Sequence, residues 1–122
     1  MRLHLVMVTT LILGSQGIVQ AEPDAARGLT LYQSRCVACH SVAYNGVGPA
    51  HQGIFGRKAG SAPNYVYSAA LKASNETWTE KTLSSWLADP EKFIPGQKMG
   101  VSVQDVSERQ DLIAYLKTLG TK

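Results

Sequence analysis

The sequence has little of what builds a disulfide framework, a structural metal site or a nucleic-acid interface. Its 122 residues include two cysteines and three histidines, and the formal net charge is +3. Two cysteines exclude a scaffold with several disulfides, and so few histidines leave a structural zinc site short of its four ligands. The mild charge gives no indication of nucleic-acid binding. No apolar run reaches the roughly 20 residues that span a bilayer, and the length fits one domain.

Both cysteines lie in one short motif, Cys36-Val37-Ala38-Cys39-His40. This is the attachment pattern of a c-type haem, in which both thiols bond to the porphyrin and the histidine binds iron. Three alternatives are less favoured. A disulfide oxidoreductase motif stands beside a βαβ pattern, which we do not find. A zinc site lacks ligands, and a disulfide across two residues closes too short a loop to stabilise much.

Residues 1–21 have the pattern of a cleaved secretory signal peptide. Arg2 and His4 form a short polar start, an apolar run covers residues 5–13, and Val-Gln-Ala at 19–21 resembles a cleavage site. We expect cleavage after Ala21, which leaves residues 22–122 as the mature domain. Export agrees with the motif, because c-type haem is attached outside the cytoplasm.

The mature chain predicts an all-α domain of three to four helices joined by two long loops. Residues able to cap a helix precede each apolar periodic segment. Asp-Pro at 89–90 ends one helix, since a residue before proline avoids the helical region. The predicted helices begin at Asp24, Ser68, Thr79 and Ser107, and the loops cover residues 41–64 and 90–106.

Met99 is a further candidate ligand. Because Met1 and Met7 fall in the predicted leader, Met99 is the one methionine of the mature domain. A thioether opposite histidine is the axial pair of electron-transfer cytochromes. Most methionines are core residues, but this one stands in a proline-containing loop and not on an apolar helical face.

Taken in order, these landmarks resemble the small class I cytochromes c shared by mitochondria and many bacteria. The resemblance extends from Gly28 to Leu119 and implies the class I cytochrome c fold, wrapped around one covalent haem, with the first and last helices crossing. Its motifs are the haem motif at 36–40, Gly48-Pro49, the segment 53–58, Trp78, the segment 93–99 and the segment 108–117.

The resemblance also implies roles for particular residues. Cys36 and Cys39 would carry the two thioethers of haem c, and His40 and Met99 would bind its iron. The Pro49 carbonyl would hold the His40 ring N–H. Around a haem propionate the resemblance puts Arg57, Tyr67 and Trp78.

Several positions depart from the family pattern. Trp86 stands where mitochondrial members have a tyrosine that hydrogen-bonds the methionine sulfur, and an indole donates but does not accept. Gly100 and Val101 follow Met99 where an apolar and an aromatic residue are usual. His51 replaces the usual leucine. We favour a solvated loop histidine there, with a third haem ligand as the alternative.

The function implied is that of a periplasmic electron carrier, not an enzyme. It would shuttle single electrons between a quinol-oxidising cytochrome complex or a periplasmic dehydrogenase and a terminal acceptor such as an oxidase or reaction centre. Transient redox partners would meet a monomer at Arg35, Lys92 and Lys98, with no nucleic acid and no stable membrane insertion. The alternatives are a peroxidase or gas sensor with a labile Met99, and a dedicated subunit of one dehydrogenase.

Overall fold

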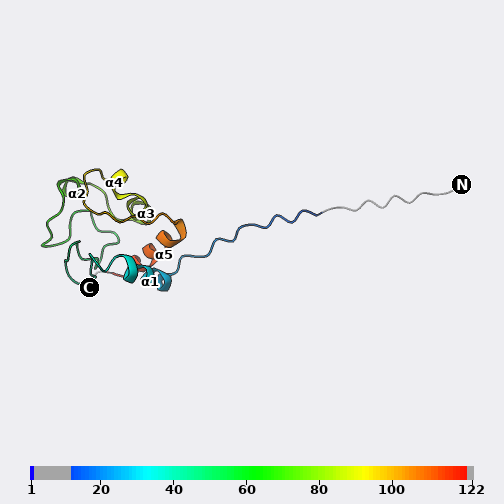
Figure 1. Cartoon of the computed structure of the whole chain (residues 1–122), viewed down its shortest axis with the longest axis horizontal. Coiled ribbons are helices and arrows are strands. Elements are labelled where there is room, and N and C mark those ends of the chain that lie inside the picture. The colour runs from blue at the N-terminus through cyan, green and yellow to red at the C-terminus, as the bar shows by residue number, and fades with distance from the viewer. Residues whose placement is uncertain (2–11, 121–122) are drawn as a thin grey trace.

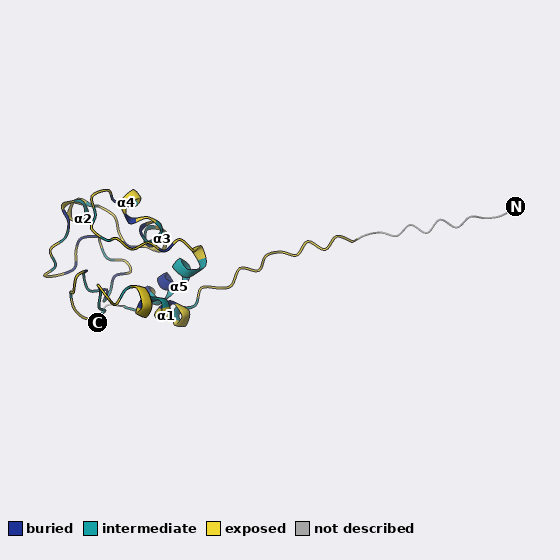
Figure 2. Cartoon of the chain, viewed as in Figure 1, coloured by how far each residue is buried: buried dark blue, intermediate teal, exposed yellow. Residues whose placement is uncertain are grey.

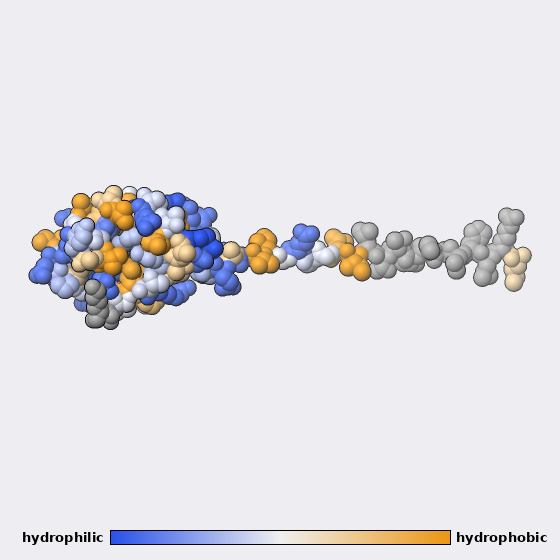
Figure 3. Space-filling view, turned by 90° about the horizontal axis from the view of Figure 1, so that it is seen from below, coloured by the Kyte–Doolittle hydropathy of each residue, from blue (hydrophilic) through white to orange (hydrophobic). Residues whose placement is uncertain are grey.

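The computed structural model describes Met1 and residues 12–120. Residues 12–23 have no helix and extend away from the domain, with exposed apolar side chains at Ile12, Leu13, Ile18 and Val19 (Figures 1 and 3). Residues 2–11, which contain most of the apolar run of the predicted leader, lie outside the described residues. Cleavage after Ala21 therefore stays a prediction.

Five helices form the described domain. They are α1 (Ala25–Arg35), α2 (Ala69–Ala73), α3 (Glu80–Ala88), α4 (Pro90–Phe93) and α5 (Val106–Lys117). Between residues 12 and 120 there is no strand, only an isolated bridge between Lys58 and Thr77. The all-α prediction is confirmed, with one helix more than the three to four expected. Over the same residues, no helix has both the length and the apolar character needed to cross a bilayer.

The predicted helix starts agree with the structure at three of four places. Asp24, Ser68 and Thr79 each accept a hydrogen bond from a backbone N–H in the first turn that follows. The prediction for the last helix was wrong. Asp105, not Ser107, caps α5, and its Oδ1 accepts from the Glu108 N–H at 2.9 Å.

The extra helix, α4, lies in the segment that we predicted to be a loop from residue 90. Asp89 ends α3, as predicted, but it also caps α4 by accepting from the Lys92 N–H at 3.1 Å. Pro90 occupies the first turn, where its fixed φ suits a helix and its missing N–H costs nothing. The same dipeptide therefore ends one helix and begins the next.

The two terminal helices, α1 and α5, lie side by side and make the most extensive contact between helices (Figure 1). Gly28 permits this approach, because a Cβ at this position would lie 2.0 Å from the Asp111 carbonyl oxygen. The rings of Tyr32 and Tyr115 pack with centroids 5.0 Å apart. The crossing of first and last helices is thus as the resemblance implied.

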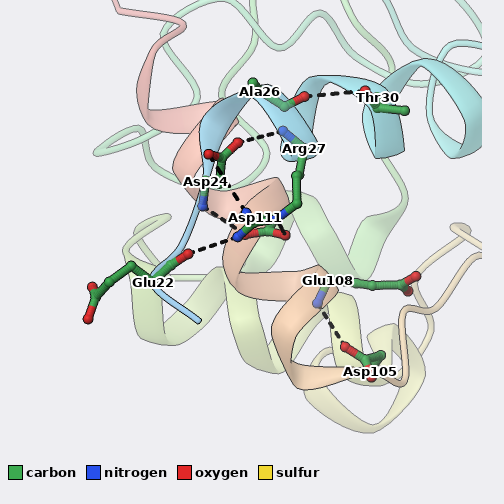
Figure 4. A network of polar contacts seen from close by, with 8 residues as sticks. All are labelled: Glu22, Asp24, Ala26, Arg27, Thr30, Asp105, Glu108 and Asp111. Atoms are coloured by element: carbon green, nitrogen blue, oxygen red, sulfur yellow. Dashed lines mark hydrogen bonds and ion pairs between the residues drawn. The ribbon is translucent and has the colours of Figure 1, made fainter. Parts of the chain in front are cut away.

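A buried carboxylate joins the start of α1 to α5 (Figure 4). Asp111 accepts hydrogen bonds from the Asp24 N–H at 2.7 Å and from Arg27 Nε at 2.8 Å and Nη2 at 3.0 Å. The guanidinium holds the pKa of this carboxyl below its usual value. Arg27 also donates to the Glu22 carbonyl at 2.8 Å, which fastens the chain just before the helix.

The core is formed by buried residues of α1, α3 and α5 together with residues of the connecting segments, while the outer sides of the helices are exposed (Figure 2). Its most deeply buried side chains are Leu83, Val103, Leu112 and Ile113. Cys36 and Met99, although far apart in sequence, are partly buried against this same core. The fold therefore brings the predicted attachment motif and the predicted second ligand to one apolar region.

Candidate haem site

A cavity of about 300 Å³ opens within this apolar region. Its lining is mainly aliphatic and aromatic, which suits a flat apolar cofactor. The segments that contribute are the end of α1, the loop from 47 to 57, residues 65–71, α3, residues 98–103 and α5. Eleven of the twelve residues to which we assigned a role line it: Arg35, Cys36, Cys39, His40, Pro49, Arg57, Tyr67, Trp78, Trp86, Lys98 and Met99. The exception is Lys92.

The His40 ring is held at one edge and crowded at another. Its Nδ1 lies 2.8 Å from the Pro49 carbonyl oxygen, so Nδ1–H donates and Nε2 keeps its lone pair. A Cβ at Gly48 would lie 2.2 Å from His40 Cε1, so only glycine lets the backbone pass this close. Burial lowers the pKa of His40, which favours the neutral imidazole that binds metals.

The two cysteines are free thiols at the end of α1. Cys36 is the C-cap residue of α1, and the Cys39 and His40 N–H groups both donate to its carbonyl. Burial raises the pKa of the Cys36 thiol to about 11. Redox-active Cys-x-x-Cys pairs depend on a lowered thiol pKa, so this environment argues against the disulfide oxidoreductase alternative.

The loop that carries Met99 is fastened on both sides. On the N-terminal side of Met99, the Glu91 carboxylate accepts hydrogen bonds from the Gly96 N–H at 2.9 Å and from Gln97 Nε2 at 3.2 Å. Gly96 adopts a φ of 90°, a region that favours glycine. After it, the Val103 N–H donates to the Leu87 carbonyl at 2.7 Å. Met99 is thereby held at the cavity wall.

Polar groups converge on the cavity from the segment before α3. The Arg57 carbonyl accepts from the Trp78 N–H at 2.9 Å, which ties the two residues together. Arg57 donates to the Gln52 and Ala50 carbonyls at 3.0 Å each, while its buried Nε has no partner among the described residues. The Tyr67 hydroxyl accepts from the Ala62 N–H at 2.9 Å and keeps its own proton to donate.

Trp86 belongs to the core on α3. Its side chain is buried, and its ring packs against that of Trp78 with centroids 5.4 Å apart. The two indoles form one aromatic wall of the cavity. Next to Met99 the wall is thinner, because a Cβ at Gly100 would meet nothing within 4 Å and Val101 is exposed.

His51 corrects the sequence analysis, because its side chain is buried and not solvated. Its Nδ1 lies 2.9 Å from the Tyr32 hydroxyl, and its ring stacks on that of His40 with centroids 4.1 Å apart. Burial, followed by the nearby His40 and Arg57, lowers the pKa of His51 to about 3. Sequence reasoning missed this pair, although a histidine at a position usually held by leucine was a signal.

The predicted partner-binding cations differ in their surroundings. Arg35 forms a two-pronged ion pair with Glu108, at 2.7 and 2.9 Å. Lys98 is exposed at the edge of the cavity. Lys92 is exposed on α4, away from the cavity lining.

The residues present fit a covalent haem. The thiols and the histidine come from the end of α1 and the residues that follow it, the thioether comes from the loop before α5, and all of them line the cavity. The unpartnered Arg57 Nε and the Tyr67 hydroxyl provide donors for anionic propionates in an otherwise apolar cavity. Such a buried, unpaired donor is costly unless a ligand meets it.

Comparisons with known proteins agree with this fit. The sequence profile of the family described as Cytochrome c matches residues 25–120. The chain is 48% identical to cytochrome c2 iso-1 of Magnetospirillum fulvum, over 70% of this chain and 92% of the relative. It is 41% identical to a cytochrome c of Euglena viridis, over 79% of this chain and 97% of the relative.

Among solved structures, cytochrome cH from Methylobacterium extorquens matches with a TM-score of 0.75 and 47% sequence identity. The match covers 78% of this chain and 98% of the other. Fold, site and matches together define an all-helical, monohaem electron-transfer protein. The chain belongs to the cytochrome c family, in which haem c is covalently bound, and its Cys36 and Cys39 fit the family's attachment motif.

Proposed function

We propose that this cytochrome c carries single electrons through one haem, bonded by Cys36 and Cys39 and ligated axially by His40 and Met99. The observation that carries the proposal is the His40 hydrogen bond to Pro49. It fixes the tautomer, leaving Nε2 free to bind iron from the cavity wall. When bound, the haem supplies a one-electron Fe(III)/Fe(II) couple.

The remaining residues prepare the site for that couple. The apolar walls, including Trp78 and Trp86, exclude water, and the neutral thioether of Met99 favours the reduced state. Arg57, Tyr67 and Trp78 would donate hydrogen bonds to the propionates. Filling both axial positions would leave no open coordination site for a substrate, which suits a carrier and not an enzyme.

The electron would enter and leave at the haem edge near Lys98. Exposed positive charge there would raise encounter rates with acidic partners, and short-lived complexes bury small interfaces. Lys98 and Lys92 are exposed, whereas Glu108 neutralises part of the Arg35 charge. We therefore assign the larger share of this attraction to the two lysines.

The proposed place of action is the periplasm, after removal of residues 1–21. There the protein would act as a monomer between a quinol-oxidising cytochrome complex or a dehydrogenase and an oxidase or reaction centre. It would need neither nucleic acid nor stable membrane insertion. Tight co-purification with one dehydrogenase would instead favour a dedicated subunit.

The visible spectrum of the oxidised protein, matured with haem in a periplasm, tests the ligand set. We expect a sulfur-to-iron charge-transfer band in the far red that disappears in Met99→Ala. Covalent haem without this band in the parent would contradict Met99 ligation. The peroxidase or gas-sensor alternative would then be tested by peroxidase turnover.

A further inference from the structure

Beside the proposed iron ligand the structure has a buried polar pair, Tyr32 on α1 and His51 in the loop after Pro49. Tyr32 is 3% exposed and His51 is 9% exposed, so the side chains of both residues are largely shielded from solvent. Buried polar side chains are costly unless they are hydrogen-bonded to one another or to the backbone. The pair satisfies this condition through the 2.9 Å contact between the Tyr32 hydroxyl and His51 Nδ1.

The direction of this hydrogen bond follows from the surroundings. The Tyr32 hydroxyl lies among apolar core residues, and His51 Nδ1 is the acceptor that the described residues provide for its proton. Tyr32 therefore donates, Nδ1 accepts, and the His51 proton resides on Nε2. One tautomer of His51 is thus fixed from α1.

His51 in turn bounds one face of His40. The two rings stack with centroids 4.1 Å apart and planes inclined by 21°. The His51 backbone is anchored as well, because its N–H donates to the Ser41 carbonyl at 2.9 Å. The hydrogen bond to Pro49 holds His40 at Nδ1 but still lets the imidazole ring rotate about that hydrogen bond. Stacking against His51 restricts this rotation.

We propose that Tyr32 and His51 are positioning residues for His40. Their hydrogen bond holds the His51 ring against the His40 ring and so sets the angle at which His40 meets the iron. The His51 imidazole is also a polar group next to the His40 ring, whereas the leucine usual at this position would be apolar. This inference rests on the proposed function, since it concerns His40 as an axial ligand.

Two consequences follow for the haem-loaded protein. Ligand orientation governs the pattern of paramagnetically shifted haem methyl resonances in the oxidised state. Polarity around the ligand governs the reduction potential, because apolar surroundings disfavour the additional positive charge of Fe(III). Removing His51 is therefore expected to change the methyl resonances and to raise the potential.

The experiment compares Tyr32→Phe, His51→Leu and the double variant, each with haem attached. We expect both single variants to shift the haem methyl resonances and His51→Leu to raise the potential. Since Tyr32 acts through His51, adding Tyr32→Phe to His51→Leu should change neither readout further. The double variant replaces both polar groups with apolar ones, so it keeps the test valid if His51→Leu alone folds poorly.

Tyr115→Phe is the matched control. The Tyr115 ring packs on Tyr32 from α5 and is partly buried, and the substitution removes a phenolic oxygen without changing the Tyr32–His51 hydrogen bond. We expect the control to leave both readouts at the parent values. Variants that lose stability while the methyl resonances and the potential stay unchanged would overturn the proposal, as would additive shifts from the two substitutions.

The parent protein separates the two proposals. A parent without covalent haem, or with a histidine other than His40 on the iron, contradicts the proposed function and this inference together. A parent with the expected spectrum, whose Tyr32 and His51 variants match it in both readouts, contradicts only this inference.

Discussion

Arg27 on α1 and Asp111 on α5 are joined by hydrogen bonds of 2.8 and 3.0 Å, although 84 residues separate them in the chain. The carboxylate is nearly inaccessible to solvent, with 7% of its side chain exposed, whereas the guanidinium is half exposed. The same carboxylate caps the start of α1 through the Asp24 N–H. One buried acid thus serves both the ion pair and the helix terminus.

Asp111→Asn is expected to lower stability at neutral pH. The pKa of Asp111 is lowered in the folded protein, first by the hydrogen bond from Arg27. Its stabilisation is therefore complete above the unfolded value of about 4 and is lost as the pH falls through the folded value. Denaturant midpoints of parent and variant should differ most near pH 7 and converge in acid.

Glu80→Gln provides the comparison for that experiment. It removes the exposed ion pair between Glu80 and Lys117 on α5, which is worth little because solvent screens it. Its midpoint should stay close to that of the parent at every pH. Equal losses in the two variants would contradict a special role for the buried acid.

Gly28→Ala should destabilise the contact between α1 and α5 strongly. The new methyl group would lie 2.0 Å from a backbone oxygen, which cannot move as a side-chain end can. Overpacking of this kind costs about 3 kcal/mol. Gly120→Ala, where the added methyl meets nothing within 4 Å, should change thermal unfolding by about 0.5 kcal/mol or less.

Gly96→Ala is expected to loosen the segment that holds Met99. Alanine at a φ of 90° is strained by about 1 kcal/mol or more, and the added methyl would also press on Ala70. Heating should abolish the far-red band at a lower temperature than in the parent. Gly100→Ala, in open space beside the same residue, should leave the band's midpoint unchanged.

Arg57→Gln should lower the reduction potential. It removes a positive charge from the cavity, and a nearby cation disfavours the additional positive charge of Fe(III). The Ala50 and Gln52 carbonyls also lose their donor, so stability should fall by about 1 kcal/mol for each bond. Redox titration of Arg57→Gln measures this change in potential, and Lys58→Gln, a substitution of the exposed neighbouring lysine, is the control. Equal potentials in the two variants would remove Arg57 from the proposed propionate site.

Lys98→Gln should slow electron transfer to an acidic redox partner at low salt. The loss of steering should disappear as ionic strength rises, because salt screens exposed charges. Stopped-flow rates measured over a range of salt give the comparison. Lys81→Gln on the outer face of α3 is the matched control, and an equally slow control would show that net charge alone matters.

Sequence patterns predicted the features that depend on neighbouring residues. The caps at Asp24 and Thr79 and the haem motif each lie within a few consecutive positions, where local geometry decides the outcome. The start of α5 was misplaced because Asp105 and Ser107 can both cap a helix. Arg109 favours the earlier start by donating to the Val103 and Gln104 carbonyls at 2.8 Å, and this contact is visible only in the folded chain.

The burial of His51 was missed for a different reason. A histidine in a glycine-rich loop is expected to be exposed to solvent, because such loops usually lie on the protein surface. Its burial depends on a partner, Tyr32, on another element 19 residues away, and on the ring of His40. Contacts between elements of this kind leave no periodic pattern in the sequence.

Because α1 packs against α5, folding of the domain depends on contacts between its first and last helices. Contacts between residues 24–28 and 111–115 close nearly the whole chain into one loop, so they cannot form until the last helix is present. A chain that emerges N-terminus first therefore presents Cys36 before the core residues of α5 that it packs near are present. The Cys36 thiol is most accessible to covalent modification during that interval, whereas Cys39 stays exposed in the folded domain.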